Sequence, residues 1–380
     1  MKKSTNNTSK KRLSNTLLWV IVFIISFILI VLNSIGRDTA GSSGFLPNST
    51  ALIRIAVITL IVCFGAYLHI FIHETGHLIA GKLSGYTFVS YRVNNFLIMR
   101  ENDKLASKWC DLPGNPGQCI MSPPDVADEQ FIYPFTFYIL GGGLANFLVS
   151  ILFLPIFFLT SGLISLVILS FMLVGIGFGI ISIIPLKMFG VTNDAYNLRL
   201  YRQSLENRRA FWINLRYVEL FTKGTRVSDM PREWFDNLKL PPNEITGVVE
   251  LMWCLFLTDQ GDIKQARDYA ILVINNPGTM LEYHLNELRF QVLFAELVGE
   301  NRPEEIEKLY TESLQAHINL LGKHVSTRRG IYAYERLHTK DEAKASEALT
   351  NFESACVTTP YKAEIPSERA LIELVKQAAE

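Results

Sequence analysis

Long uncharged stretches dominate the first half of the chain. Residues 13–36 and 131–186 contain no Asp, Glu, Lys or Arg, and residues 55–81 contain only Glu74. Each stretch is long enough to cross a bilayer core of about 30 Å as a helix. As one helix, residues 131–186 would extend roughly 84 Å, so we expect this stretch to fold back with a turn at residues 160–162. The pattern predicts four transmembrane helices.

The rest of the chain has other periodicities. Residues 86–93 are rich in β-branched and aromatic side chains, and residues 101–103 have the composition of a turn, which predicts a small β-hairpin. Beyond about residue 200 the pattern is that of soluble helices. We therefore expect an all-α membrane protein with a small β-hairpin. Its parts would be an N-terminal tail and first anchor (1–36), a membrane core (51–200) and a cytoplasmic helical domain (201–380).

The charges predict an orientation. Lys and Arg residues gather in the N-terminal tail, in residues 82–130 and after residue 187, so these parts should face the cytoplasm. Both termini would then be cytoplasmic in a multi-pass protein of the plasma membrane. The 49% hydrophobic content and the mean hydropathy of +0.21 agree with a membrane protein that carries a soluble part. A formal net charge of zero suggests no nucleic-acid partner.

The candidate chemistry lies in the sequence His-Glu-Thr-Gly-His at residues 73–77, inside the second uncharged stretch. Two histidines four apart on a helix lie about 6 Å apart along the axis and about 40° apart around it, so His73 and His77 can reach one metal ion. Glu74 can then take a proton from a zinc-activated water, as in hydrolytic metalloproteases. An ionisable residue inside a membrane is costly and persists mostly for function. We therefore favour a site over an ordinary polar helix face, with His69 as a supporting or packing group.

Two later segments extend this motif. Residues 141–146 read Gly-Gly-Gly-Leu-Ala-Asn at the opening of a later span, and Asp194 follows the end of the next span. With residues 73–77 they resemble the site-2 protease family of intramembrane zinc metalloproteases, over about residues 51–200. The chain departs from the family pattern at the third motif, where the usual run ends in Leu-Asp-Gly but Ala195 follows Asp194. Asp194 is also suited to be a helix N-cap or turn residue, and that alternative stays open.

The resemblance implies a role for each matching residue. One Zn²⁺ per chain would be held by His73, His77 and Asp194, with Glu74 as the general base. Asn146 would hydrogen-bond the substrate backbone or the developing oxyanion. The glycines before Asn146 would let two helices approach closely, and a packing face alone is the alternative for this motif.

The same resemblance implies a membrane-embedded peptide as substrate, such as an anti-sigma factor, a signal-peptide remnant or a peptide precursor. The predicted hairpin would either receive the unwound substrate as an added strand or only shield the entrance. A protease-derived scaffold that binds or helps export membrane peptides without cutting is the alternative function. We disfavour it because a scaffold has no need of Glu74.

The soluble half and the cysteines carry weaker signals. Residues 260–270 resemble the turn and second helix of a tetratricopeptide repeat, with a fainter copy at residues 340–345. Such repeats stack into peptide-binding surfaces, so this part would either dock a cytoplasmic peptide partner or merely pack. Cys110 and Cys119 are expected to be free thiols, because the orientation places them in reducing cytoplasm.

Overall fold

The computed structural model describes residue 26 and residues 51–101, 104–110, 116–126, 131–188, 191–235 and 241–380. These residues are mostly helical, with one small antiparallel sheet. The expected first span, residues 13–36, lies outside the described residues except for Ser26. Within the described part, three helical segments are long and apolar enough to cross a membrane, not four: Ile55–Leu83, Phe135–Leu159 and Gly162–Ile183.

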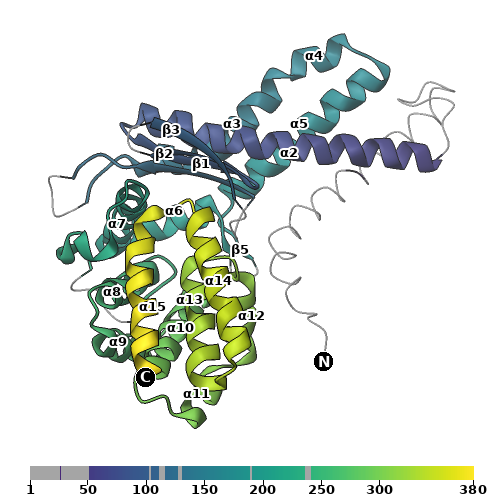
Figure 1. Ribbon diagram of the computed structural model, residues 1–380. Coiled ribbons are helices and arrows are strands. Elements are labelled where there is room, and N and C mark those ends of the chain that lie inside the picture. Colours follow the sequence, from purple (N-terminus) through teal and green to yellow (C-terminus); the bar gives the residue numbers. More distant parts are fainter. Residues whose placement is uncertain are drawn as a thin grey trace.

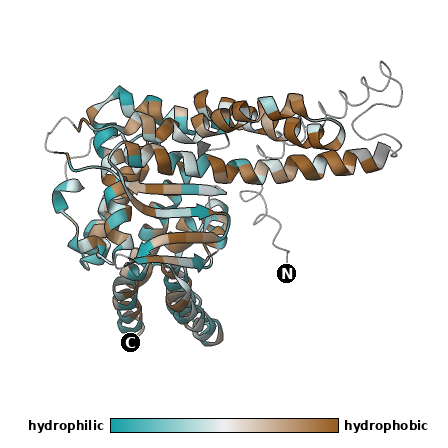
Figure 2. Ribbon diagram, turned by 90° about the horizontal axis from the view of Figure 1, so that it is seen from above, coloured by the Kyte–Doolittle hydropathy of each residue, from teal (hydrophilic) through white to brown (hydrophobic). Residues whose placement is uncertain are grey.

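The apolar helices form an arm that projects from the rest of the molecule (Figure 1). The arm consists of α2 (Ala51–Leu83), α3 (Phe135–Leu152), α4 (Leu154–Leu159) and α5 (Gly162–Ile183). Figure 2 shows hydrophobic residues along the whole arm. Large apolar side chains stay exposed on it, such as Leu60, Phe64, Leu148 and Phe158, which is the surface that a lipid-facing helix presents.

The predicted fold-back of residues 131–186 is present. α3 and α4 run one way, α5 returns beside α3, and the chain reverses at residues 160–162. Gly162 there has a φ of +61°, a conformation that is strained for residues with a Cβ. Pro155 has no backbone N–H, and the helix is interrupted just before it, at Phe153 between α3 and α4.

The predicted β-hairpin was too small. The structure has a four-stranded antiparallel sheet in the order β3-β2-β1-β4, made of β1 (Thr87–Val93), β2 (Phe96–Glu101), β3 (Lys104–Trp109) and β4 (Gly117–Ser122). The chain first reverses after β1, where Asn94 has a φ of 51°, a conformation that Asn tolerates. The turn predicted at residues 101–103 falls between β2 and β3 in the sequence, and its residues 102–103 lie outside the described residues. β4 pairs with β1 across a long connection, which a pattern of neighbouring residues does not reveal.

The remaining helices form a body beside the sheet, in which the C-terminal helices lie roughly across the direction of the arm (Figure 1). Two-residue strands β5 (Lys187–Met188) and β6 (Val191–Thr192) lead into it. Its longer helices are α6 (Asp194–Gln203), α7 (Leu205–Thr222), α8 (Thr246–Asp259), α9 (Ile263–Asn275), α10 (Glu282–Val298), α11 (Pro303–Leu309), α12 (Glu312–Leu320), α13 (Val325–Ala333), α14 (Glu342–Thr358) and α15 (Ile365–Ala378). Single-turn segments are η1 (Val227–Asp229), η2 (Arg232–Trp234), the π-helical η3 (Tyr334–Thr339) and η4 (Lys362–Glu364).

Both segments with repeat-like sequences are helix pairs. α8 and α9 pack together around a turn at Gly261, whose φ is +87°. α13 and η3 pack against α14 in the same way.

One hydrophobic core joins the arm, the sheet and the first helices of the body. It contains Ile70 of α2, Met121 of β4, Tyr138 of α3, Phe211 of α7 and Phe256 of α8, all buried in one cluster. The boundary expected at residues 200–201 therefore lies inside a continuous core. Two further clusters fill the body from α8 to α15.

Candidate metal centre

Helix α2 places two imidazoles side by side near its C-terminal end. Residues four apart share a helix face, and His73 Nε2 lies 3.1 Å from His77 Nε2. Both side chains are largely buried, with 16% and 11% of their surface exposed. Their pyridine-type nitrogens point at the same spot, as the His-x-x-x-His spacing predicts.

Asp194 completes the group from a helix 117 residues further along the chain. Its Oδ2 lies 3.2 Å from His73 Nε2 and 3.7 Å from His77 Nε2. Within the described residues these three side chains form a group that could hold a metal ion. Three ligands at about 2.0–2.1 Å from a tetrahedral metal are separated from one another by about 3.3–3.4 Å. The observed separations therefore suit three corners of a tetrahedron, with the fourth left for water or substrate.

Asn193 holds Asp194 in this position. The Asn193 side chain is the N-cap of α6 and accepts a hydrogen bond from the Tyr196 backbone N–H at 3.0 Å. The same oxygen accepts from Leu186 N–H at 3.0 Å, and the amide nitrogen donates to the Ile184 carbonyl at 2.7 Å. The end of α5 and the start of α6 are thus tied together. Asp194 is the first residue of α6 and not its cap, so the N-cap alternative was wrong.

The protonation of Asp194 suits a ligand. Burial would raise the pKa of this carboxyl, but the charge of His77, and the hydrogen bond and charge of His73, lower the pKa below its usual value. Asp194 is therefore an ionised carboxylate at neutral pH, which is the form that binds metals.

His77 is oriented by a backbone carbonyl. Its Nδ1 lies 2.8 Å from the carbonyl oxygen of Tyr138, so Nδ1 carries the proton and donates to that oxygen. This tautomer leaves Nε2 with a free lone pair facing Asp194 and His73. A hydrogen bond from the second ring nitrogen is the usual support of a metal-binding histidine.

His73 is supported by a relay that passes through Asn146 to His69. Asn146 is fully buried, with Oδ1 3.0 Å from His69 Nδ1 and Nδ2 3.2 Å from His73 Nδ1. His69 Nε2 lies 2.9 Å from the Phe171 carbonyl and therefore carries a proton. In the neutral imidazole Nδ1 then needs a donor. A half-turn of the amide, which exchanges its oxygen and nitrogen in place, satisfies every group. Asn146 then donates to His69 and accepts from His73 Nδ1–H, which leaves His73 Nε2 free for a metal.

The glycines of residues 141–143 make room for this arrangement. A Cβ at Gly142 would lie 2.5 Å from His73 Nε2 and 2.6 Å from His77 Nε2. One at Gly141 would lie 2.6 Å from the carbonyl oxygen of Gly76 on α2. Such distances are far inside van der Waals contact, so α3 approaches α2 this closely only because these positions have no side chain.

Glu74 lies beside the group, against the sheet. It is 7% exposed, and the backbone of Cys119 in β4 hydrogen-bonds to it. A Cβ at Gly117, the first residue of β4, would collide with the Glu74 carboxylate. The sheet is held over this part of α2 by the Tyr91 hydroxyl, which donates to the Phe71 carbonyl at 2.9 Å. The beginning of β4 therefore covers the candidate general base.

The sequence predicted most of these side chains but not their supports. His73, His77 and Asp194 come together, Glu74 lies next to them, and His69 is a supporting group. Asn146 bonds to two histidines, and the substrate contact that the resemblance implies for it stays a prediction. Asn193 and Gly117 were missed. Asn before the helix-starting Asp194 is a recognisable cap signal, whereas nothing local indicates that Gly117 meets Glu74.

The cysteines carry no cross-link. All five are free thiols, as expected for Cys110 and Cys119.

Comparison with known proteins gives no relative: no protein-family model, no curated protein and no solved structure matches the chain.

Proposed function

We propose that this protein is an intramembrane zinc metalloprotease of the site-2 protease type. The observation that carries the proposal is the convergence of His73, His77 and Asp194 at separations that suit a tetrahedral ion, with the buried carboxylate of Glu74 beside them. Two imidazoles, one carboxylate and an open fourth position are the donor set of hydrolytic zinc enzymes.

The membrane is part of the proposal. Ile55 and His73 are 18 residues apart on one helix, which is roughly 27 Å along its axis. The catalytic group would therefore lie close to the cytoplasmic end of its span, and the sheet and helical body would be cytoplasmic. Substrates would be peptide segments embedded in the same membrane.

The chain's own residues divide the chemistry of peptide hydrolysis. Bound Zn²⁺ would supply a Lewis acid that lowers the pKa of water and polarises the peptide carbonyl. Glu74 takes the proton of the attacking water on its carboxylate and later gives it to the leaving amine. Asp194 and the two imidazoles hold the ion, while Asn146 and the Tyr138 carbonyl keep those imidazoles turned towards it.

The sheet offers a way to present an unwound peptide. β4 is an edge strand, and its first residue, Gly117, lies against Glu74. An extended peptide pairing with the beginning of β4 would pass close to the catalytic carboxylate. A helical substrate must open before cleavage, because its backbone amides are otherwise bonded within the helix.

The test is cleavage by purified protein in detergent, with a membrane-segment peptide as substrate. Glu74→Gln should keep zinc and fold but lose nearly all cleavage, because an amide does not take the proton from water. Glu347→Gln, on the exposed surface of α14, is the matched control and should cut at the wild-type rate. Wild-type cleavage by the zinc-loaded Glu74→Gln protein would refute the proposal.

A further inference from the structure

A large cavity lies where the sheet meets the helical body, away from the candidate metal centre. Its volume is about 720 Å³. Asn95 and Cys110 from the connections of the sheet line one side. Most of the rest comes from α7, α8, α10, α13 and α15, and from the segment between α14 and α15 that contains Tyr361 and Glu364. Trp109 at the end of β3 also borders the cavity and is 78% exposed. A cavity of this size with an exposed aromatic at its border is large enough to hold several side chains of a peptide.

Two buried polar groups that line this cavity have one unused hydrogen-bonding atom each. Arg329 is 1% exposed; its Nε donates to Glu368 at 2.6 Å and its guanidinium lies 4.0 Å from the centre of the Phe294 ring. Among the described residues, Arg329 Nη1 has no acceptor and Gln291 Oε1 has no donor. Buried groups of this kind cost free energy until they are paired. One donor and one acceptor together match a peptide group, which offers a carbonyl and an N–H.

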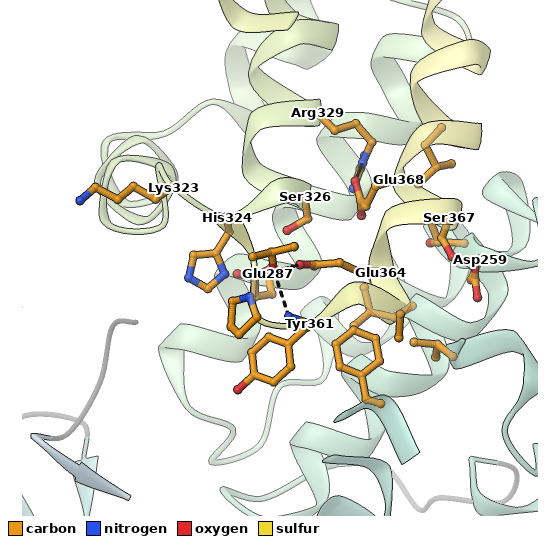
Figure 3. A pocket seen from close by; sticks show the side chains of 18 of the residues that line it. Asp259, Glu287, Lys323, His324, Ser326, Arg329, Tyr361, Glu364, Ser367 and Glu368 are labelled. Atoms are coloured by element: carbon orange, nitrogen blue, oxygen red, sulfur yellow. Dashed lines mark hydrogen bonds and ion pairs between the residues drawn. The ribbon is translucent and has the colours of Figure 1, made fainter. Parts of the chain in front are cut away.

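The acidic side chains of the cavity differ in whether they have a basic partner. Figure 3 shows Glu364, Glu368, Arg329 and Glu287 approaching one space from different helices. Glu368 forms an ion pair with Arg329, and Glu287 accepts a hydrogen bond from His317 Nε2 at 2.8 Å. Among the described residues Glu364 has no such partner: it accepts from the Thr359 hydroxyl at 2.6 Å, and burial raises the pKa of its carboxyl to about 7. Lys362 is close enough to act on this carboxyl but forms no ion pair with it among the described residues, so a cation that entered the cavity could pair with it.

The wall next to Glu364 suits the stem of a basic side chain. Tyr217 and Phe221 are stacked with their ring centres 5.6 Å apart, and Phe221 lies 5.7 Å from Tyr361. Aromatic faces bind the methylene groups of Lys and Arg and attract the charge at their ends.

We propose that this cavity binds an extended basic peptide segment, with a Lys or Arg side chain at Glu364 and a peptide group between Arg329 and Gln291. The segment we assign to it is the cytoplasmic flank of the membrane substrate. Membrane proteins carry their Lys and Arg residues on the cytoplasmic side of their spans, so the charge of such a flank complements the cavity. This assignment rests on the proposed function.

The sheet connects the cavity to the candidate metal centre. The backbone N–H of Asn94 donates to the Pro116 carbonyl at 2.6 Å, and that of Cys110 donates to the Asn95 carbonyl at 2.8 Å. Gly117 follows Pro116 and lies against Glu74. The cavity and the beginning of β4 are therefore connected through the turn at Asn94 and Asn95. A peptide anchored in the cavity would have its adjoining segment directed towards β4, the strand that covers the catalytic carboxylate.

The experiment measures binding of fluorescein-labelled octapeptides to the full-length protein in uncharged detergent by fluorescence anisotropy. Three peptides share an alanine-rich sequence and carry two adjacent residues of Lys, Gln or Glu. The variants are Glu364→Gln, an isosteric change in the cavity, and Glu373→Gln, the same change at an exposed carboxylate of α15.

We expect the Lys peptide to bind wild-type protein at least tenfold more tightly than the Gln or Glu peptide. Glu364→Gln should weaken binding of the Lys peptide about tenfold and leave binding of the Gln peptide unchanged. Glu373→Gln should change the affinity for neither peptide. Equal affinity for Lys and Gln peptides, tighter binding of the Glu peptide, or a Lys preference that survives Glu364→Gln would overturn the proposal. The assay involves no cleavage, so its failure leaves the proposed protease activity untouched, and an inactive protease that still binds the Lys peptide leaves the cavity assignment standing.

Discussion

The Asn146 relay predicts that a residue outside the ligand set controls metal affinity. Asn146→Ala removes the bridge between His69 and His73, whose nearest ring nitrogens lie 3.0 and 3.2 Å from its amide. His73 then loses the acceptor that holds its Nδ1–H, and its ring is free to turn away from Asp194. Loss of such an outer hydrogen bond costs about 10- to 100-fold in metal affinity, or roughly 1.4–2.7 kcal/mol.

The same substitution also destabilises the fold, and the assay must separate the two effects. Two buried ring nitrogens lose their partner, at about 1–3 kcal/mol each, in addition to the small cavity left by the amide. We therefore propose to measure the zinc dissociation constant by competition with a chromogenic chelator, using protein whose helical circular dichroism at the assay temperature equals that of the wild type.

The control is Asn319→Ala, an exposed position on α12, which should change neither zinc affinity nor stability. His69→Leu should reduce zinc affinity less than Asn146→Ala does, because Asn146 still reaches His73 in the His69→Leu variant. A folded Asn146→Ala protein with wild-type zinc affinity would refute the relay.

Two further predictions concern space at the ligands and a buried carboxyl. Gly142→Ala should strongly reduce bound zinc, because its Cβ would lie 2.5–2.6 Å from the ligand nitrogens. Gly65→Ala is the control and should keep its zinc, because its Cβ would meet no atom closer than 3.8 Å. The zinc content of both purified variants is measured by elemental analysis, and equal zinc content would contradict the close approach of α3 to the ligands. Burial raises the folded-state pKa of Glu364 to about 7, so the folded protein holds a proton that the unfolded chain has lost. Its contribution to stability is complete below about pH 4.5 and is lost as the pH rises through 7. Glu364→Gln should therefore increase the free energy of unfolding by on the order of 2 kcal/mol at pH 8 and by roughly a quarter of that at pH 5, after allowance for partial solvation. A pH-independent difference in denaturant titrations would contradict this.

Local geometry explains which parts of the site the sequence predicts. His73, Glu74 and His77 occupy neighbouring positions on one helix, so the 3.6-residue repeat alone places two imidazoles together. The four-stranded sheet, three helices (α3, α4 and α5) and the β5–β6 pair separate Asp194 from them in the chain. The suitability of a carboxylate as a third zinc ligand and the resemblance to a protease family pointed to it. Its position depends on Asn193, whose bonds to the end of α5 join parts of the chain that a periodicity does not relate.

Long-range contacts explain what the sequence did not reveal. Uncharged length located α2, α3 and α5, because a span needs little more than apolar composition. β4 was missed because its pairing with β1 spans a long connection and its sequence, Gly-Gln-Cys-Ile-Met-Ser, alternates weakly. The boundary expected at residue 200 lies within one continuous hydrophobic cluster. Phe211 and Phe256 belong by sequence to the soluble half but pack in the cluster that contains Ile70 of α2.

The most direct test of the proposed centre is the zinc content of Asp194→Ala, measured by elemental analysis on protein purified without added metal. Asp194 lies within 3.7 Å of both imidazole nitrogens, so we expect about one zinc per wild-type chain, and a loss of most of that zinc in Asp194→Ala comparable to the loss in His73→Ala. Unchanged zinc content in Asp194→Ala would contradict a centre made of His73, His77 and Asp194.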